Sequence, residues 1–115
     1  MDILVRGRNV PVDPAIEAES RRKLGKLPRY APDIRRVEVE FSEIRNPRAA
    51  ERIQCEVIVH LTQNFVKAHA TAADARTALD RVVGKAEHQI GKVKSKRIAR
   101  SRPHHGDVVQ HLKTT

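Results

Sequence analysis

Aromatic side chains are scarce in this chain of 115 residues, which has one tyrosine, two phenylalanines and no tryptophan. Proteins that hold single-stranded RNA stack its bases on aromatic side chains. Tyr30, Phe41 and Phe65 offer few such platforms. If the chain binds a nucleic acid, we therefore expect it to contact phosphates and to recognise shape rather than to stack on bases.

Cysteine and long apolar runs are also scarce. A single cysteine, Cys55, excludes an internal disulfide and fits a reducing cytosol. Because it lies in an alternating strand-like run, we predict that it is a small buried hydrophobe. Residues 1–10 lack the apolar length of a signal peptide or a membrane span. These features predict a soluble, cytoplasmic protein without a membrane partner.

Catalytic motifs are missing as well: the sequence has no glycine-rich phosphate loop, nucleophile motif or paired-carboxylate motif. Glu38 and Glu40 share one face of a predicted strand and are most simply its solvated side. One enzymatic alternative remains, because His60 and His69 on adjacent predicted strands could act together in acid–base cleavage of RNA. A surface pair without a catalytic role is the simpler interpretation, since Lys67 sits between them. We predict no enzyme, no metal and no cofactor.

Positive charge is what the chain has in excess. It carries 23 Lys and Arg against 14 Asp and Glu, a formal net charge of +9. Such a balance favours association with nucleic acid or an anionic surface and says nothing about the fold. The length suits one domain with a single modest core.

Two stripes at helical spacing run side by side through residues 73–97. Positions three and four apart share a helix face, so one stripe would lie on a core and the other would form a row of cations. The apolar stripe is Ala75, Leu79, Val82, Ala86, Ile90 and Val93, and the basic stripe is Arg81, Lys85, His88, Lys92 and Lys96. Only Asp80 and Glu87 oppose seven Lys and Arg between residues 76 and 97, which favours a polyanion partner.

A second basic helix is predicted near the N-terminus, from Pro14 to about Leu27. Asp13 would cap it, Pro14 would occupy its first turn, and the prolines that follow would end it. Its exposed side carries Arg22, Lys23, Lys26 and Arg29. These cations could join those of the last helix in one surface.

Alternating apolar residues predict strands over residues 2–8, 34–42, 52–62 and 65–72. If Gln63 and Asn64 form a two-residue turn, Val59 pairs with Ala68, and the apolar residues of both strands share a face. The order is therefore β-α-β-β-β-α. This is an α+β fold, one four-stranded sheet with two helices packed on one face, and it resembles the double-stranded-RNA-binding module with an added first strand. Residues 1–100 would form the domain and 101–115 a flexible linker or tail.

Three segments carry a resemblance to a known family. The first strand is followed by Val12-x-Pro14-Ala15-Ile16, and the first helix ends with Leu24-x-Lys26-Leu27 and then Arg29 and Tyr30. The last helix carries a fuller pattern, namely Asp74, Ala78, Leu79, Asp80, Lys85, Glu87, Gln89, Ile90, Lys92 and Lys96. In these residues the chain resembles the ribosome hibernation-promoting factors, which include the ribosome-associated translation inhibitor. The likeness covers about residues 2–100. Ala75 and Arg76 replace the family's Met-Tyr, Ala86 its Leu and His88 its Arg.

The resemblance implies a non-enzymatic stress-response protein in the decoding region of the small ribosomal subunit. There its two basic helices would contact rRNA and block the mRNA and tRNA sites, which inhibits translation. The residues that would bind rRNA are Arg22, Lys23, Lys26, Arg29, Arg81, Lys85, His88, Lys92, Lys94 and Lys96. Long members carry a further domain that pairs two ribosomes, and the linker-like composition of residues 101–115 favours the front part of such a protein. This chain alone would be monomeric. A generic double-stranded-RNA-binding module is the alternative.

Overall fold

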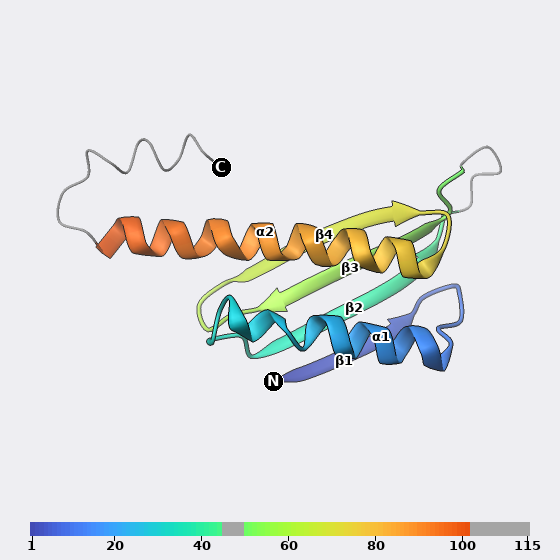
Figure 1. Cartoon of the computed structure of the whole chain (residues 1–115), viewed down its shortest axis with the longest axis horizontal. Helices are drawn as coiled ribbons and strands as arrows, with labels where there is room; N and C mark the ends of the chain where they lie inside the picture. Colours follow the sequence, from blue (N-terminus) through green and yellow to red (C-terminus); the bar gives the residue numbers. More distant parts are fainter. Residues whose placement is uncertain (45–49, 102–115) are drawn as a thin grey trace.

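The computed structural model describes residues 1–44 and 50–101, with the side chains of residues 94–101 left undescribed. Its elements follow the predicted order β-α-β-β-β-α (Figure 1). The strands are β1 (Asp2–Gly7), β2 (Arg36–Glu43), β3 (Ile53–His60) and β4 (Phe65–Ala72), and the helices are α1 (Pro14–Leu24) and α2 (Ala75–Ser101). The predicted linker therefore lies outside the described residues, except for Ser101, which ends α2.

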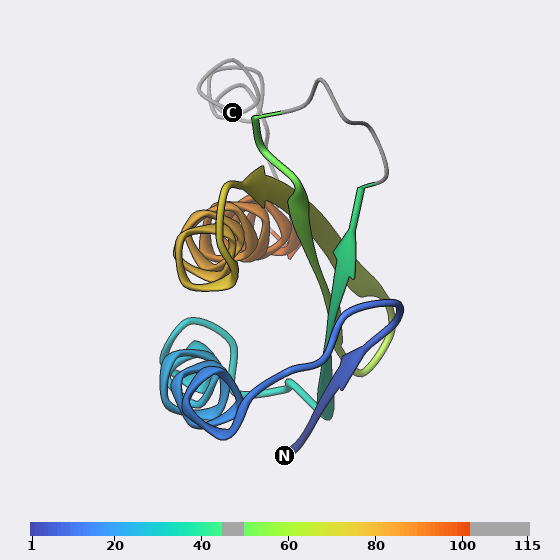
Figure 2. The ribbon, with the colours of Figure 1, turned by 90° about the vertical axis from the view of Figure 1, so that its right-hand side faces the viewer.

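The sheet has the strand order β1-β2-β3-β4. β1 runs parallel to β2, and the other neighbours are antiparallel. Both helices cover the same face of the sheet, as predicted, with α1 beside β1 and α2 over β3 and β4 (Figure 2). Among the described residues no helix lies on the other face, and β1 and β4 are the edge strands of the sheet.

Helix ends differ from the prediction because of local hydrogen bonds. Asp74 caps α2 by accepting from the backbone N–H of Thr77 at 2.8 Å, so the helix begins at Ala75 rather than at residue 73. This bond is the main reason that the pKa of Asp74 lies below its usual range. α1 ends at Leu24 rather than near Leu27, and a separate 3₁₀ helix covers Leu27–Arg29. Pro28 has no N–H with which to extend an α-helix, and this accounts for the break.

The core lies between the sheet and the helices. The apolar stripe of α2 is confirmed, since Leu79, Val82, Ala86 and Ile90 are at most 1% exposed. Cys55 is fully buried, as predicted, and burial raises the pKa of its thiol to about 12.

The predicted register between β3 and β4 is wrong by two residues. Val59 lies opposite Val66 rather than Ala68, because the turn spans four residues and is closed by the N–H of Leu61, which donates to the carbonyl of Asn64 at 2.8 Å. A shift of two preserves the side-chain faces, so the apolar sets still meet.

The correct register separates the two histidines of the enzymatic alternative. His60 lies opposite Phe65, whereas His69 lies opposite Glu56, four residues further along β4. At about 3.4 Å per residue the two side chains start about 14 Å apart. They cannot share a proton, and His60 instead contacts Glu38 on β2 at 2.6 Å.

Candidate nucleic-acid interface

Lys23 connects the two helices rather than facing solvent alone. Its Nζ lies 2.6 Å from a carboxylate oxygen of Asp80 on α2, and its side chain is 26% exposed. At this point the two helices meet through an ion pair between a cation in the last turn of α1 and an acid of α2. Lys23 thus has a structural contact as well as a charge.

The other cations of the first basic segment are exposed. Lys26 and Arg29 lie beyond the end of α1, and Arg22 makes a two-point contact with Glu19 at 2.9 and 3.1 Å. That contact lowers the pKa of the Glu19 carboxyl and raises the pKa of Arg22. Exposed pairs of this kind contribute little to stability, so Arg22 can exchange its carboxylate for a phosphate at small cost.

On α2 the basic stripe points toward the outer edge of the sheet. Arg81 Nη1 donates to the carbonyl of Thr71 at 2.7 Å and to Glu51 at 2.6 Å, which lowers the pKa of Glu51. Lys85 Nζ donates to the carbonyl of His69 at 3.0 Å. Thr71 and His69 belong to β4, the edge strand farthest from β1 and α1. Arg81 and Lys85 therefore reach away from α1, and the expectation that they adjoin Lys23 in one surface is wrong.

Of the four remaining predicted site residues, the structure describes the side chains of two. His88 is exposed and Lys92 half-buried, both on the same helix as Lys85. The side chains of Lys94 and Lys96 lie outside the described residues. Sequence reasoning missed Lys67 and Gln89, which lie close to Lys85 and His88 in the structure. Nothing in the sequence pattern of a single strand or helix marked these two as neighbours.

On the sheet face that no described helix covers, acidic and basic side chains are paired. Three glutamates lie on it, and each contacts a cation on a neighbouring position or strand. The pairs are Glu38 with Arg36 and His60, Glu40 with Arg6, and Glu56 with Lys67. The hydrogen bond with His60 is the main cause of the lowered pKa of Glu38. This face is charge-paired, so the helix side and the β4 edge are the better surfaces for a polyanion.

No group of three or more His, Cys, Asp or Glu with the geometry to hold a metal ion occurs among the residues that the structure describes. Within that same part of the chain, no helix has the length and apolarity to cross a membrane.

Comparison with known proteins identifies the family. The model of the Sigma 54 modulation protein / S30EA ribosomal protein family matches residues 3–98. The chain belongs to this family. Its members are ribosome hibernation and subunit-interface factors, which are not enzymes, so the alternative of an RNA-cleaving enzyme is excluded.

One relative supports the family assignment. The chain is 30% identical over 97 residues to the ribosome hibernation promotion factor of Bacillus subtilis strain 168, covering 84% of this chain and 50% of that protein. It thus spans half the length of this relative.

Two solved structures share the fold of this S30EA family member. The N-terminal domain of Thermus thermophilus Protein Y has a TM-score of 0.68 and 29% identity over 81% of this chain and 99% of that one. A ribosomal subunit interface protein from Coxiella burnetii has a TM-score of 0.73 at 22% identity, over 83% of this chain and 99% of that one. The predicted family and the predicted α+β fold are both confirmed.

Proposed function

We propose that this chain is a ribosome hibernation factor whose helix side binds rRNA in the decoding region of the small subunit. Its folded domain would occupy the paths of mRNA and tRNA and so inhibit translation. Family membership supports the association with ribosomes. The observation that carries the choice of surface is the basic stripe of α2, which lies outside the core and has exposed or exchangeable contacts.

The proposed mechanism needs no chemistry. Arg81 and Lys85 now donate to backbone carbonyls, and Arg22 and Arg81 contact carboxylates, so each already holds its donors toward oxygen atoms. Phosphate oxygens carry more charge than carbonyls and accept the same donors. The proposed rRNA contacts are those of Arg22, Lys23, Lys26, Arg29, Arg81, Lys85, His88, Lys92, Lys94 and Lys96. Because ribosomes work there, the proposed location is the cytoplasm.

Binding should fall steeply with salt, since neutralising phosphates releases counterions. An interface with about five phosphate contacts would lose on the order of 100-fold in affinity between about 50 and 200 mM salt. Co-sedimentation of the 115-residue chain with purified small subunits over this range measures the slope. Absence of co-sedimentation at the lowest salt would overturn the proposal.

A generic double-stranded-RNA-binding module is the second candidate, because the order α1-β2-β3-β4-α2 matches that module. The same assay separates the two candidates when an excess of a free RNA duplex is added. The hibernation proposal expects the protein to stay on the subunits. Displacement by the duplex would favour the second candidate.

The chain by itself should bind single ribosomes without pairing them. A domain with a formal charge of +9 repels its own copy, and stable self-association needs a well-packed interface on the order of 1,000 Å² or more. We expect a sucrose gradient of ribosomes with added protein to show single ribosomes and no dimer peak. A peak of ribosome dimers would show that this domain is sufficient for pairing.

A further inference from the structure

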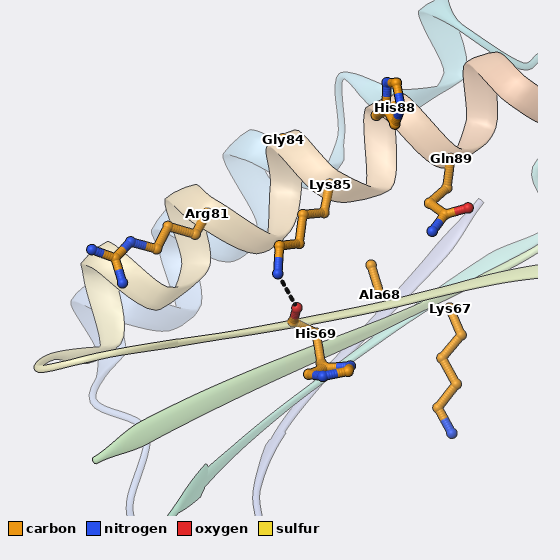
Figure 3. A pocket seen from close by; sticks show the side chains of 8 residues that line it. All are labelled: Lys67, Ala68, His69, Arg81, Gly84, Lys85, His88 and Gln89. Carbon is orange, nitrogen blue, oxygen red and sulfur yellow. Dashed lines mark hydrogen bonds between the residues drawn. The ribbon is translucent and has the colours of Figure 1, made fainter. Parts of the chain in front are cut away.

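A groove of about 640 Å³ lies between α2 and the edge strand β4 (Figure 3). α2 contributes Arg81, Gly84, Lys85, His88 and Gln89, and β4 contributes Lys67, Ala68 and His69. Among these lining residues three carry fixed positive charge, two are histidines and none is acidic. The side chains that line the groove therefore carry a net positive charge, with Glu51 contacting Arg81 and Glu56 contacting Lys67 at its margins.

Small residues keep the groove open. Ala68 points from β4 toward α2, as Figure 3 shows, and fills little of the space beneath the helix. Gly84 has no side chain, and a Cβ atom built there would meet nothing within 4 Å. Larger residues at these two positions would narrow the space between helix and strand.

The edge of β4 adds backbone hydrogen-bond donors. Lys85 contacts the carbonyl of His69 and Arg81 that of Thr71, so these carbonyls point outward from the sheet. In an antiparallel strand the N–H and C=O of one residue point to the same side. The N–H of His69 therefore also points outward, as does that of Lys67 two residues away, and no further strand lies beyond β4 in the described sheet.

Cations lie on both sides of this edge. Arg81 and Lys85 reach down from α2, whereas Lys67 and His69 point away from α2 on the opposite side of the strand (Figure 3). Lys67 lies 3.5 Å from Glu56, and its side chain is 54% exposed, so it can turn to an outside anion at little cost. Basic side chains thus lie on both sides of the β4 edge, and backbone N–H donors point outward along it.

We infer that one RNA strand runs along this groove and the edge of β4, with its phosphates held by Arg81 and Lys85 on the α2 side and by Lys67 on the other side of the strand. The inference rests on the proposed function and extends the rRNA interface from the helices to a strand. Phosphodiester is the ligand class because the lining offers donors and positive charge, and it has no Phe, Tyr or Trp ring on which a base could stack; its rings are the imidazoles of His69 and His88.

Lys67 provides the first test, with Arg6 as its matched control. Both are exposed strand cations on the uncovered face, and each contacts a glutamate on a neighbouring strand. Lys67 lines the groove, whereas Arg6 lies on β1 at the far edge. We expect Lys67→Gln to weaken binding to small subunits about tenfold and to reduce the salt slope by about 1, and Arg6→Gln to change neither. Equal behaviour of the two variants would overturn the inference.

Gly84 provides a second test that leaves charge unchanged. Gly91 is the matched control, because it is exposed on the same helix two turns later, has nothing within 4 Å of a built Cβ, and does not line the groove. Gly84→Trp should weaken binding at least about tenfold, whereas Gly91→Trp should leave it within about twofold. Circular dichroism of both variants confirms that α2 is retained.

The two tests distinguish failure of the groove from failure of the proposed function. If neither Lys67→Gln nor Gly84→Trp weakens binding while the wild-type chain still co-sediments with small subunits, the helices bind rRNA and the groove stays empty. If the wild-type chain does not bind at low salt, the proposed function itself is overturned, and this inference with it.

Discussion

Reversing the charge of both Lys85 and Lys92 to Glu should abolish ribosome binding and leave the fold intact. Both residues lie off the apolar stripe of α2, and Lys85 makes its described contact with an edge carbonyl rather than with the core. If each reversal removes about 1.4 kcal/mol of favourable interaction, the double variant binds on the order of 100-fold more weakly. Replacing a cation by an anion adds repulsion from phosphates, so the loss should exceed this figure. Titration of labelled small subunits with the variant measures it.

A matched control separates the position of the charges from their number. Arg6→Glu with Arg36→Glu changes the net charge by the same amount on the uncovered face of the sheet, where both arginines contact glutamates. This control should bind nearly as well as the wild-type chain, apart from a weak general effect of lower net charge. If it loses as much affinity as the Lys85 and Lys92 variant, binding follows total charge, and the helix side is not the interface.

Truncating Leu79 to Ala should do the reverse, destabilising the fold while leaving the basic surface in place. Leu79 is fully buried between α2 and the sheet, where strands contribute small side chains such as Ala70 and Ala72. Deleting a buried leucine to alanine costs about 2–5 kcal/mol, because transfer free energy is lost and a cavity remains. Urea unfolding followed by circular dichroism measures this loss as a change in the free energy of unfolding.

The binding of the Leu79→Ala variant checks the separation of core and surface. At a temperature where the variant is fully folded, its affinity for small subunits should lie within about twofold of the wild type. A large loss of affinity in the folded variant would mean that the position of α2 on the sheet, and not only its charges, determines binding. A free-energy loss well under 1 kcal/mol would contradict the assignment of Leu79 to the core.

Periodicity was sufficient to predict the elements and their order. The alternation through Val57 and Val59 and the spacing of Leu79, Val82 and Ile90 are local signals, and each element buries the face that its pattern predicts. An apolar sheet face must be shielded from water, so the packing of both amphipathic helices on that face could also be predicted. The register of the β3–β4 hairpin could not be predicted in this way, because a two-residue turn and a four-residue turn leave the apolar residues on the same face. The hydrogen bond from Leu61 within the loop shows that the turn has four residues.

The candidate site was harder to predict, because it depends on which way a stripe points after packing. The spacing predicted that Arg81 and Lys85 share one helix face. It could not predict that this face would lie on the side of α2 away from α1. Lys67 carried no signal in its own strand, since an exposed lysine is ordinary there. Its place in the groove arises only because β4 is an edge strand beneath α2. Such neighbours come from tertiary packing and not from local pattern.

A structure of the chain bound to the small ribosomal subunit, determined by electron cryomicroscopy, tests the central claim most directly. We predict density for this domain in the decoding region, with α1 and α2 facing rRNA, an RNA strand along the groove and the edge of β4, and the uncovered sheet face turned away apart from Lys67 at that edge. Density at a site that leaves the mRNA and tRNA paths open, or contact with rRNA through β1, β2 and β3 on the uncovered sheet face, would contradict this prediction.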